Sequence, residues 1–422
     1  MKLTRDYDNY EDYIKFQKQK TEDPTKRKKW LNEEWRSKID GFKHEFSRLS
    51  NFLTHDKRCL CLGARTGQEV VALNELGLSD VVGIDIVPNE PHVILGDIHN
   101  LGFEDNSFDF IYTNIIDHSV DPQKMISEAE RVMKVGGIMM IQVQVGIHQD
   151  EYTEFMIDNT FMDIVPLFNE SYCVHIGPIR QDKAPTIFGM NYELVFQKDK
   201  KLVELNEKYG NIKTVEVPEN YQKIWNDINH KIQTRKLDSA GITNATERLE
   251  ILSGLQRRAY YLTRIADTHD VKNIAEVGTA EGWQFYSFCE YAESVGGQVI
   301  TCDPRDVRHA DYIKKFEHEI KIGTFVNATS AEMSVRATDI DLFYIDGLHD
   351  KGTVATDVTN LMKSQSSTQM PVWILDDFDV RFGCFEDIAH ICIMSRKFKV
   401  WKVGKTASGY DSHQAMFTGR IT

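Results

Sequence analysis

The 422-residue sequence has no long apolar run, few prolines and no excess of positive charge. Its longest apolar stretches, such as residues 137–145, span about nine residues, whereas a membrane-spanning helix needs about 20. Ten prolines and 26 glycines are too few for a disordered or fibrous chain. The formal net charge is −14, and nucleic-acid binders usually carry a basic face that neutralises phosphates. We therefore expect no membrane insertion and no nucleic-acid partner.

Cysteine is sparse, and its spacing indicates neither disulfides nor zinc. The seven cysteines are scattered, their number is odd, and no CxxC pair occurs. We expect reduced thiols of a cytosolic chain that mostly fill small spaces in the core. The first residues, MKLTRDYDNYEDY, lack the apolar core of a signal peptide, so the expected location is cytoplasmic. Hydrophobic residues at 41% and charged residues at 27% are ordinary for a globular enzyme.

Apolar spacing divides the chain into two similar halves. Short continuous apolar runs alternate with helix-length segments from Arg58 onward and again from Asn273 onward, which predicts parallel strands buried on both faces. The expected fold class is α/β, with two doubly wound, Rossmann-like domains. Each should contain a mainly parallel, seven-stranded sheet with an antiparallel edge. Spacing of three to five residues between apolar positions also predicts an amphipathic helix over Trp30–Leu49.

These patterns set the expected boundaries along the chain. We expect an N-terminal helical segment at 1–50, a first domain at 51–198, a helical linker and cap at 199–265, and a second domain at 266–422. The linker is polar, and its residues have the spacing of helices. Two α/β domains, together with the N-terminal and linking helices, therefore account for the length of the chain.

A glycine turn follows the first expected strand in each half. It reads CLGARTG at 61–67 and EVGTAEG at 276–282. Glycine lets the backbone approach a ligand and reach positive φ, and open α/β sheets bind ligands at the carboxyl ends of their strands. The next strand ends in Asp85 or Asp303, where a carboxylate suits the two hydroxyls of an adenosine ribose. Neither turn reads GxGxxG, which disfavours a dinucleotide. The alternative is that these glycines only form turns.

At these residues both halves resemble class I S-adenosylmethionine-dependent methyltransferases, and the resemblance covers most of the chain. The first half resembles the type 11 group, in which the residue at Asp97 lies beside the adenine of the cofactor. The second half resembles the macrocin O-methyltransferase-like group of metal-dependent sugar methyltransferases. The motifs that carry the resemblance are GDIHNLGF at 96–103, NSFDFI at 106–111, ERVMKVGG at 130–137, DGLH at 346–349, Asp357, and ILDDF at 374–378.

Three carboxylates are expected to converge at one edge of the second sheet. Asp346 follows the fourth expected strand of this half, and Asp376 and Asp377 follow the fifth. Adjacent parallel strands lie about 4.8 Å apart, and carboxylates so close together repel one another unless a cation joins them. Mg²⁺ accepts a few carboxylates and makes the proton of a sugar hydroxyl more acidic. The resemblance supports Mg²⁺ or another divalent cation at all three, and capping of the strand ends is the alternative.

The candidate base is His349, three residues after Asp346. The unperturbed pKa of a histidine, about 6.5, suits a base at neutral pH. It would take the proton of the acceptor hydroxyl while the oxygen attacks the sulfonium methyl in line. A structural or cofactor-orienting histidine is the alternative.

The first half departs from its family at the glycine turn. Cys61 stands where an acid usually helps to hold the ammonium group of the cofactor, and Arg65 replaces the middle glycine of GxGxG. The Arg65 guanidinium would pair with the cofactor carboxylate or with a phosphate of a nucleotide sugar. Asp117 and His118 are acid–base candidates or stabilise their loop. Three interpretations stay open: a second O-methyltransferase, a glycosyltransferase on a methyltransferase-like fold, or a non-catalytic module that holds the acceptor or mediates dimerisation.

The sequence thus predicts an S-adenosylmethionine-dependent O-methyltransferase whose second domain is catalytic. The expected reaction is Mg²⁺-assisted methylation of sugar hydroxyls on a glycan or a glycosylated small molecule. The expected partners are that acceptor and, at the first domain, a nucleotide sugar, and assembly into a homo-oligomer is left open. The expected cofactor contacts are Glu276, Gly278, Gly282, Asp303 and Ser330 in the second half, and Gly63, Arg65, Gly67, Asp85 and Asp97 in the first.

Overall fold

A computed structural model describes residues 3–146, 151–179, 189–213, 215–366, 368–405 and 411–421, without the side chains of 223–232, 312, 405 and 411. The chain forms two compact units, Met1–Leu202 and Val203–Thr422, and each is described by itself. The helical stretch 203–265 thus falls within the second unit. None of the described helices has an apolar stretch long enough to cross a membrane.

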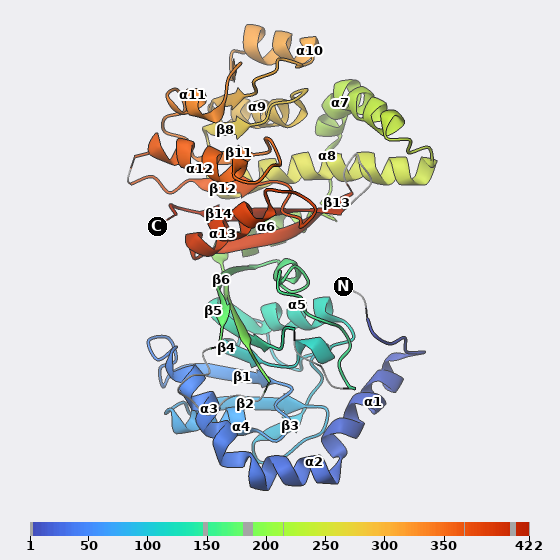
Figure 1. Ribbon diagram of the computed structural model, residues 1–422, viewed down its shortest axis with the longest axis vertical. Helices are drawn as coiled ribbons and strands as arrows, with labels where there is room; N and C mark the ends of the chain where they lie inside the picture. The colour runs from blue at the N-terminus through green and yellow to red at the C-terminus, as the bar shows by residue number, and fades with distance from the viewer. Residues whose placement is uncertain are drawn as a thin grey trace. The chain divides into compact units, whose positions relative to one another are not determined.

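The sheet of the first unit has the strand order β6-β7-β5-β4-β1-β2-β3 (Figure 1). Strands β1 to β5 are parallel, and β7 runs antiparallel to both β5 and β6. The inner strands are buried on both faces, as their continuous apolar runs predict. The bounds are β1 (Arg58–Leu62), β2 (Asp80–Asp85), β3 (Val93–Leu95), β4 (Phe108–Thr113), β5 (Met133–Val143), β6 (Ser171–Pro178) and β7 (Tyr192–Lys198).

Helices of the first unit pack on its sheet. Phe46 of α3 packs edge-on against the rings of Phe110 and Tyr112, with ring centroids 5.8 and 5.0 Å apart. The single helix predicted over Trp30–Leu49 is wrong at its start, because a π-helical turn at Lys29–Glu33 precedes α3. The bounds are α1 (Tyr10–Glu22), α2 (Pro24–Lys28), α3 (Trp35–Ser47), α4 (Gln68–Glu75) and α5 (Pro122–Val132).

The second unit repeats this arrangement with the strand order β10-β9-β8-β11-β12-β14-β13. Its strands β8 to β14 take the positions that β1 to β7 take in the first unit, including the antiparallel edge. Two doubly wound α/β sheets with mixed edges confirm the predicted fold class. The bounds are β8 (Ile274–Val277), β9 (Val299–Cys302), β10 (Gly323–Val326), β11 (Leu342–Ile345), β12 (Val372–Leu375), β13 (Phe398–Lys405) and β14 (Asp411–Thr418).

Aromatic stacking between neighbouring strands fills the core of the second unit. The ring of Trp373 on β12 lies 4.2 Å from that of Phe343 and 5.7 Å from that of Phe417, both nearly parallel to it. A second π-helical turn covers Ile313–Glu319. The helices are α6 (Lys200–Tyr209), α7 (Glu219–Ser239), α8 (Ala245–Thr268), α9 (Trp283–Val295), α10 (Ala310–Tyr312), α11 (Ser330–Ser334), α12 (Thr353–Lys363) and α13 (Phe385–Ser395).

The glycine turn after β8 lies directly against the end of β11. The Asp346 N–H donates to the Val277 carbonyl (2.9 Å), and Gly278 has a φ of +95°. A Cβ added to Gly278 would lie 1.9 Å from the Asp346 carbonyl oxygen, which leaves room only for glycine. This contact fixes the edge of the sheet at which the candidate site lies.

Gly278→Ala tests this close approach, with Gly241→Ala as the matched control. At Gly241 φ is also positive (+73°), but an added Cβ meets nothing within 4 Å. We expect the control to cost about 1–2 kcal/mol of left-handed backbone strain. Gly278→Ala should lower the melting temperature of the second unit clearly further, because β8 or β11 has to shift. Equal melting temperatures in scanning calorimetry would contradict the packing described above.

Candidate functional site

The glycine turn of the second unit is held to the acid at the end of β9. The Ala280 N–H donates to Asp303 Oδ2 (3.1 Å), and the Arg305 N–H donates to Asp303 Oδ1 (2.9 Å). Asp303 is buried, and it lines a cavity of about 1150 Å³ at the carboxyl ends of the strands. The carboxylate is therefore fixed beside the turn, as a contact to ribose hydroxyls requires.

Glu276 is a buried acid on the strand that leads into the turn. Its Oε2 accepts the Thr301 hydroxyl (2.7 Å), which in turn lies 2.6 Å from the Thr279 hydroxyl. Burial, and secondarily the charge of Asp303, raises the pKa of Glu276 to about 8. A cationic ligand beside it would stabilise its ionised form. Glu276 lines the same cavity and is thus placed to hold an ammonium group.

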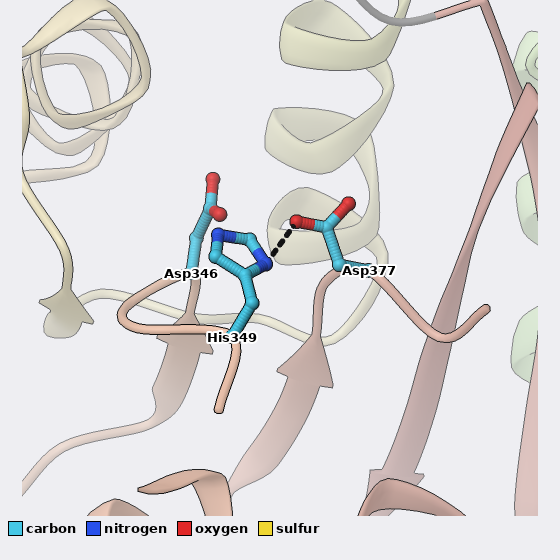
Figure 2. A group of neighbouring side chains, drawn as sticks. All are labelled: Asp346, His349 and Asp377. Atoms are coloured by element: carbon cyan, nitrogen blue, oxygen red, sulfur yellow. Dashed lines mark ion pairs between the residues drawn. The ribbon is translucent and has the colours of Figure 1, made fainter. Parts of the chain in front are cut away.

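Asp346, His349 and Asp377 meet at the ends of β11 and β12 (Figure 2). His349 Nδ1 lies 2.6 Å from Asp377 Oδ2, and one ligand atom from each of the three lies within 4.8 Å of the others. Hydrogen bonding to Asp377 and Cys384 raises the pKa of His349 to about 10. Burial and the nearby Asp376 and Asp377 carboxylates raise the pKa of Asp346. Two carboxylates and an imidazole form a donor set that suits a divalent cation.

Asp376 takes a different position from the one predicted. It is buried and accepts hydrogen bonds from the Tyr344 hydroxyl (2.8 Å) and from Gln414 Nε2 (3.0 Å). Its Oδ2 also lies 3.3 Å from Arg258 Nη2. Burial raises the pKa of Asp376, but the Arg258 charge and these hydrogen bonds outweigh it, so the pKa is lowered. The structure therefore brings two of the three predicted metal ligands together with His349 and pairs the third with Arg258.

Of the other predicted residues of the second half, Ser330 also lines this cavity, whereas Gly282 does not. Ser330 is buried at the start of α11, where its hydroxyl accepts a hydrogen bond from Asn360 Nδ2 (3.2 Å). Gly282 caps α9 in the left-handed region, with a φ of +94°. The cavity, at about 1150 Å³, is slightly larger than the usual ligand pocket of about 300–1,000 Å³. A nucleoside cofactor and an acceptor would therefore fit together.

The glycine turn of the first unit repeats the contact between turn and acid. The Arg65 N–H donates to Asp85 Oδ2 (3.0 Å), and Gly63 and Gly67 have φ values of +69° and +92°. The position before the turn, where an acid would stand, is occupied by the buried thiol of Cys61. The Arg65 guanidinium lies 4.5 Å from the centre of the Trp30 ring.

Helix α1 covers this first site. The Tyr10 hydroxyl donates to Asp97 (2.7 Å), the residue predicted to lie beside an adenine. Asp97 is partly buried, yet hydrogen bonds from His99 and Tyr10 lower the pKa of Asp97 to about 2. The Tyr13 hydroxyl donates to the His118 carbonyl (3.0 Å). The cavity beneath α1 measures only about 70 Å³, far less than its counterpart in the second unit.

The contacts of Asp117 and His118 are those of a stabilised loop. The Asp117 carbonyl accepts the Glu154 N–H (2.8 Å). His118 Nδ1 lies 2.8 Å from the Tyr152 carbonyl, and His118 Nε2 lies 3.2 Å from Lys20 Nζ. Both ring nitrogens therefore have partners within the protein.

Two residues that the sequence analysis did not single out enter these sites. Arg258 comes from α8, outside the predicted second domain, and Tyr10 comes from the polar N-terminal segment. Neither belongs to a motif, and each reaches its site only through long-range packing. The sequence carries one signal for Arg258. It falls among the apolar positions of the amphipathic helix α8, where a charged side chain is rarely buried unless it is paired.

Two family models match the chain, one in each unit. Residues 60–141 match a model described as a methyltransferase domain, and residues 275–378 match a second model with the same description. Both segments contain most of the first strand, the glycine turn and the following acid. The chain therefore carries two methyltransferase-family domains in tandem, of the S-adenosylmethionine-dependent class, which confirms the resemblance.

Uncharacterized methyltransferases of Mycobacterium bovis and Mycobacterium tuberculosis are 36% identical to this chain over 91 residues. The match covers 19% of this chain and 37% of each relative, so the chain spans little more than a third of their length.

Among solved structures, a Burkholderia thailandensis 1,6-didemethyltoxoflavin-N1-methyltransferase with bound 1,6-didemethyltoxoflavin and S-adenosylhomocysteine is 13% identical. It covers 47% of this chain and 94% of its own, with a TM-score of 0.36. A Pyrococcus horikoshii protein is 16% identical and covers 45% of this chain and 100% of its own, with a TM-score of 0.31. The domains are identified by the family models, and the reaction has to be argued from the site.

The raised pKa of Glu276 predicts a pH dependence of cofactor binding. Below about pH 8 the Glu276 carboxyl is protonated, and a cofactor ammonium binds the ionised form better. Affinity for S-adenosylhomocysteine should therefore rise nearly tenfold per pH unit between about pH 6 and pH 7.5. Glu276→Gln should bind weakly and without this slope. Isothermal titration calorimetry at several pH values measures it.

Glu290→Gln is the control for this measurement. Glu290 is a second partly buried acid, on α9, and burial raises its pKa, but it does not line the cavity. This variant should keep the slope of the wild type. A flat pH profile in the wild type would contradict the assignment of Glu276.

Proposed function

We propose that the chain is an S-adenosylmethionine-dependent O-methyltransferase whose second unit is catalytic. Its reaction is metal-assisted methylation of sugar hydroxyls on a glycan or a glycosylated small molecule. The observation that carries the proposal is the meeting of Asp346, His349 and Asp377 beside the glycine turn, on the wall of a cavity of about 1150 Å³. The match of residues 275–378 to a methyltransferase-domain model supports methyl transfer at this unit.

The residues present fit the cofactor. The turn offers a close backbone approach at Gly278, Asp303 faces the cavity as a ribose acceptor, and Glu276 offers a carboxylate to the ammonium group. S-Adenosylmethionine supplies a sulfonium methyl group, which needs orientation more than activation. The protein therefore mainly positions the acceptor oxygen and takes up its proton.

The residues present also fit a divalent cation. Asp346 and Asp377 are the carboxylates that would hold it, and His349 completes a set of donors within 4.8 Å. Mg²⁺ or a similar ion makes the proton of a neighbouring hydroxyl more acidic and suits the paired hydroxyls of a sugar. Asp376 supports the site from behind through Tyr344, whose hydroxyl lies 3.1 Å from Asp346 Oδ2 and 2.8 Å from Asp376 Oδ2.

During transfer the bond between the acceptor oxygen and the methyl carbon forms while the bond between that carbon and sulfur breaks. The hydroxyl proton leaves the acceptor, and His349 is the group placed to receive it, because its side chain faces the cavity and is 40% exposed. A cation held by Asp346 and Asp377 would lower the raised pKa of His349, so that the imidazole is neutral and able to take the proton. Asp377 fixes the ring through Nδ1, which leaves Nε2 for the proton. If His349 instead binds the cation, it positions the site and a solvent base takes the proton.

For the first unit, the contacts favour a non-catalytic role. Helix α1 covers the turn, the Tyr10 hydroxyl donates a hydrogen bond to Asp97, and Cys61 replaces the acid before the turn. We propose that this unit binds substrate or supports the fold. The second candidate is a glycosyltransferase on a methyltransferase-like fold that takes a nucleotide sugar, favoured by the Arg65 guanidinium in the turn.

Metal dependence is tested with Asp346→Asn and Asp377→Asn. Each removes a carboxylate and should weaken Mn²⁺ binding about 10- to 100-fold in titration calorimetry. Methyl transfer should fall by at least as much, whereas binding of S-adenosylhomocysteine should change little. Asp311→Asn is the control, because Asp311 is 73% exposed on α10. Full activity in excess chelator would rule the metal-assisted reaction out.

A further inference from the structure

Arg258 is a buried cation at the floor of the second cavity. It is 5% exposed, and its guanidinium lies 4.8 Å from the centre of the Trp283 ring. Nη2 lies 3.3 Å from Asp376 Oδ2 and 3.8 Å from Asp346 Oδ2. These are ion-pair distances, and among the described residues Arg258 forms no hydrogen bond within the usual range. Its Nε is buried and has no partner among the side chains that the structure describes.

Gln284 offers a second set of unpaired polar atoms in the same cavity. It is the second residue of α9 and is 3% exposed. Neither its Oε1 nor its Nε2 has a partner among the described residues. Buried polar groups are nearly always hydrogen-bonded, and leaving one unpaired costs about 1–3 kcal/mol. Two such side chains lining one cavity therefore point to a ligand that completes their hydrogen bonds.

The chemistry of the wall identifies the ligand. Arg258 carries only donors and a positive charge, Glu276 offers a carboxylate to the same cavity, and the Gln284 amide has an NH₂ donor group and an oxygen acceptor. An α-amino acid carries a carboxylate and an ammonium group on one carbon, which matches this set. Neutral sugar hydroxyls do not need a buried guanidinium.

We propose that Arg258 and Gln284 bind the α-carboxylate of the methionine part of S-adenosylmethionine, while Glu276 and the Gln284 carbonyl oxygen bind its ammonium group. The inference rests on the cofactor of the proposed function and not on its metal or acceptor. Arg258 lies on α8, outside the matched segment 275–378. The helical stretch before the second domain is then part of the cofactor site.

The test compares two ligands that differ in the amino-acid part. S-Adenosylhomocysteine has it, and 5′-methylthioadenosine lacks it. Arg258→Met should weaken the binding of S-adenosylhomocysteine roughly 10- to 100-fold in titration calorimetry, as expected for a lost hydrogen bond to a charged group. The affinity for methylthioadenosine should stay within about threefold. Gln284→Leu should show the same selectivity with a smaller loss.

Arg257→Met is the matched control, because Arg257 is the neighbouring residue on α8 and does not line the cavity. It should bind both ligands as the wild type does. Far-UV circular dichroism and melting temperatures check that each variant folds. If Arg258→Met does not fold, Gln284→Leu alone decides the proposal.

A double variant separates direct binding from support of Asp376. Arg258→Met/Asp376→Asn removes the buried carboxylate charge that the single variant leaves unpaired. If Arg258 binds the cofactor, the double variant still binds S-adenosylhomocysteine weakly. Recovery of wild-type affinity would overturn the proposal, because Arg258 would then act only through Asp376.

Three further results overturn the proposal. One is wild-type affinity for S-adenosylhomocysteine in both Arg258→Met and Gln284→Leu. Another is an equal loss for both ligands. The third is unchanged cofactor binding with a raised KM for the acceptor, which would assign Arg258 to an anionic acceptor group. A wild type that binds neither ligand refutes the proposed function itself, which is a distinct outcome.

Discussion

The second site depends on the contact between the Gly278 backbone and the end of β11. The backbone of the glycine turn contacts the backbone of Asp346 directly. The turn and the group of Asp346, His349 and Asp377 therefore cannot move independently. The Asp346 N–H on the Val277 carbonyl keeps the strands in register, and Tyr344 links Asp346 to the buried Asp376. Methyl transfer from a reactive sulfonium mainly requires that the acceptor oxygen be positioned correctly. A rigid edge of the second sheet therefore suits the proposed reaction.

Much of the fold could be predicted from the sequence because its signals are local. Continuous apolar runs indicated parallel strands, and the residues 276–282 placed a glycine turn after β8, where the structure has it. The helix over Trp30–Leu49 failed at its start, because apolar spacing does not reveal a π-helical turn. The different positions of the Asp376 and Asp377 side chains could not be predicted either. Successive residues of an extended chain point to opposite sides, and only the position of Arg258 decides which of the two is paired with it.

The two units show how one strand order supports two different sites. In the second, helices α7 and α8 leave a wide cavity with unpaired polar groups on its wall. In the first, α1 lies on the glycine turn, and Tyr10 takes the carboxylate that a cofactor would use. Fold alone therefore does not assign activity, and the difference lies in what covers the carboxyl ends of the strands.

Methyl transfer is proposed to occur at the second unit alone. The most direct measurement is mass spectrometry of glycans and nucleotide sugars incubated with Mg²⁺ and S-adenosylmethionine that carries a deuterated methyl group. The wild type should add labelled methyl groups to a sugar hydroxyl, and the chain with Asp346→Asn should add almost none. Undiminished labelling by Asp346→Asn, or addition of a sugar in place of a methyl group, would contradict methyl transfer at the second unit.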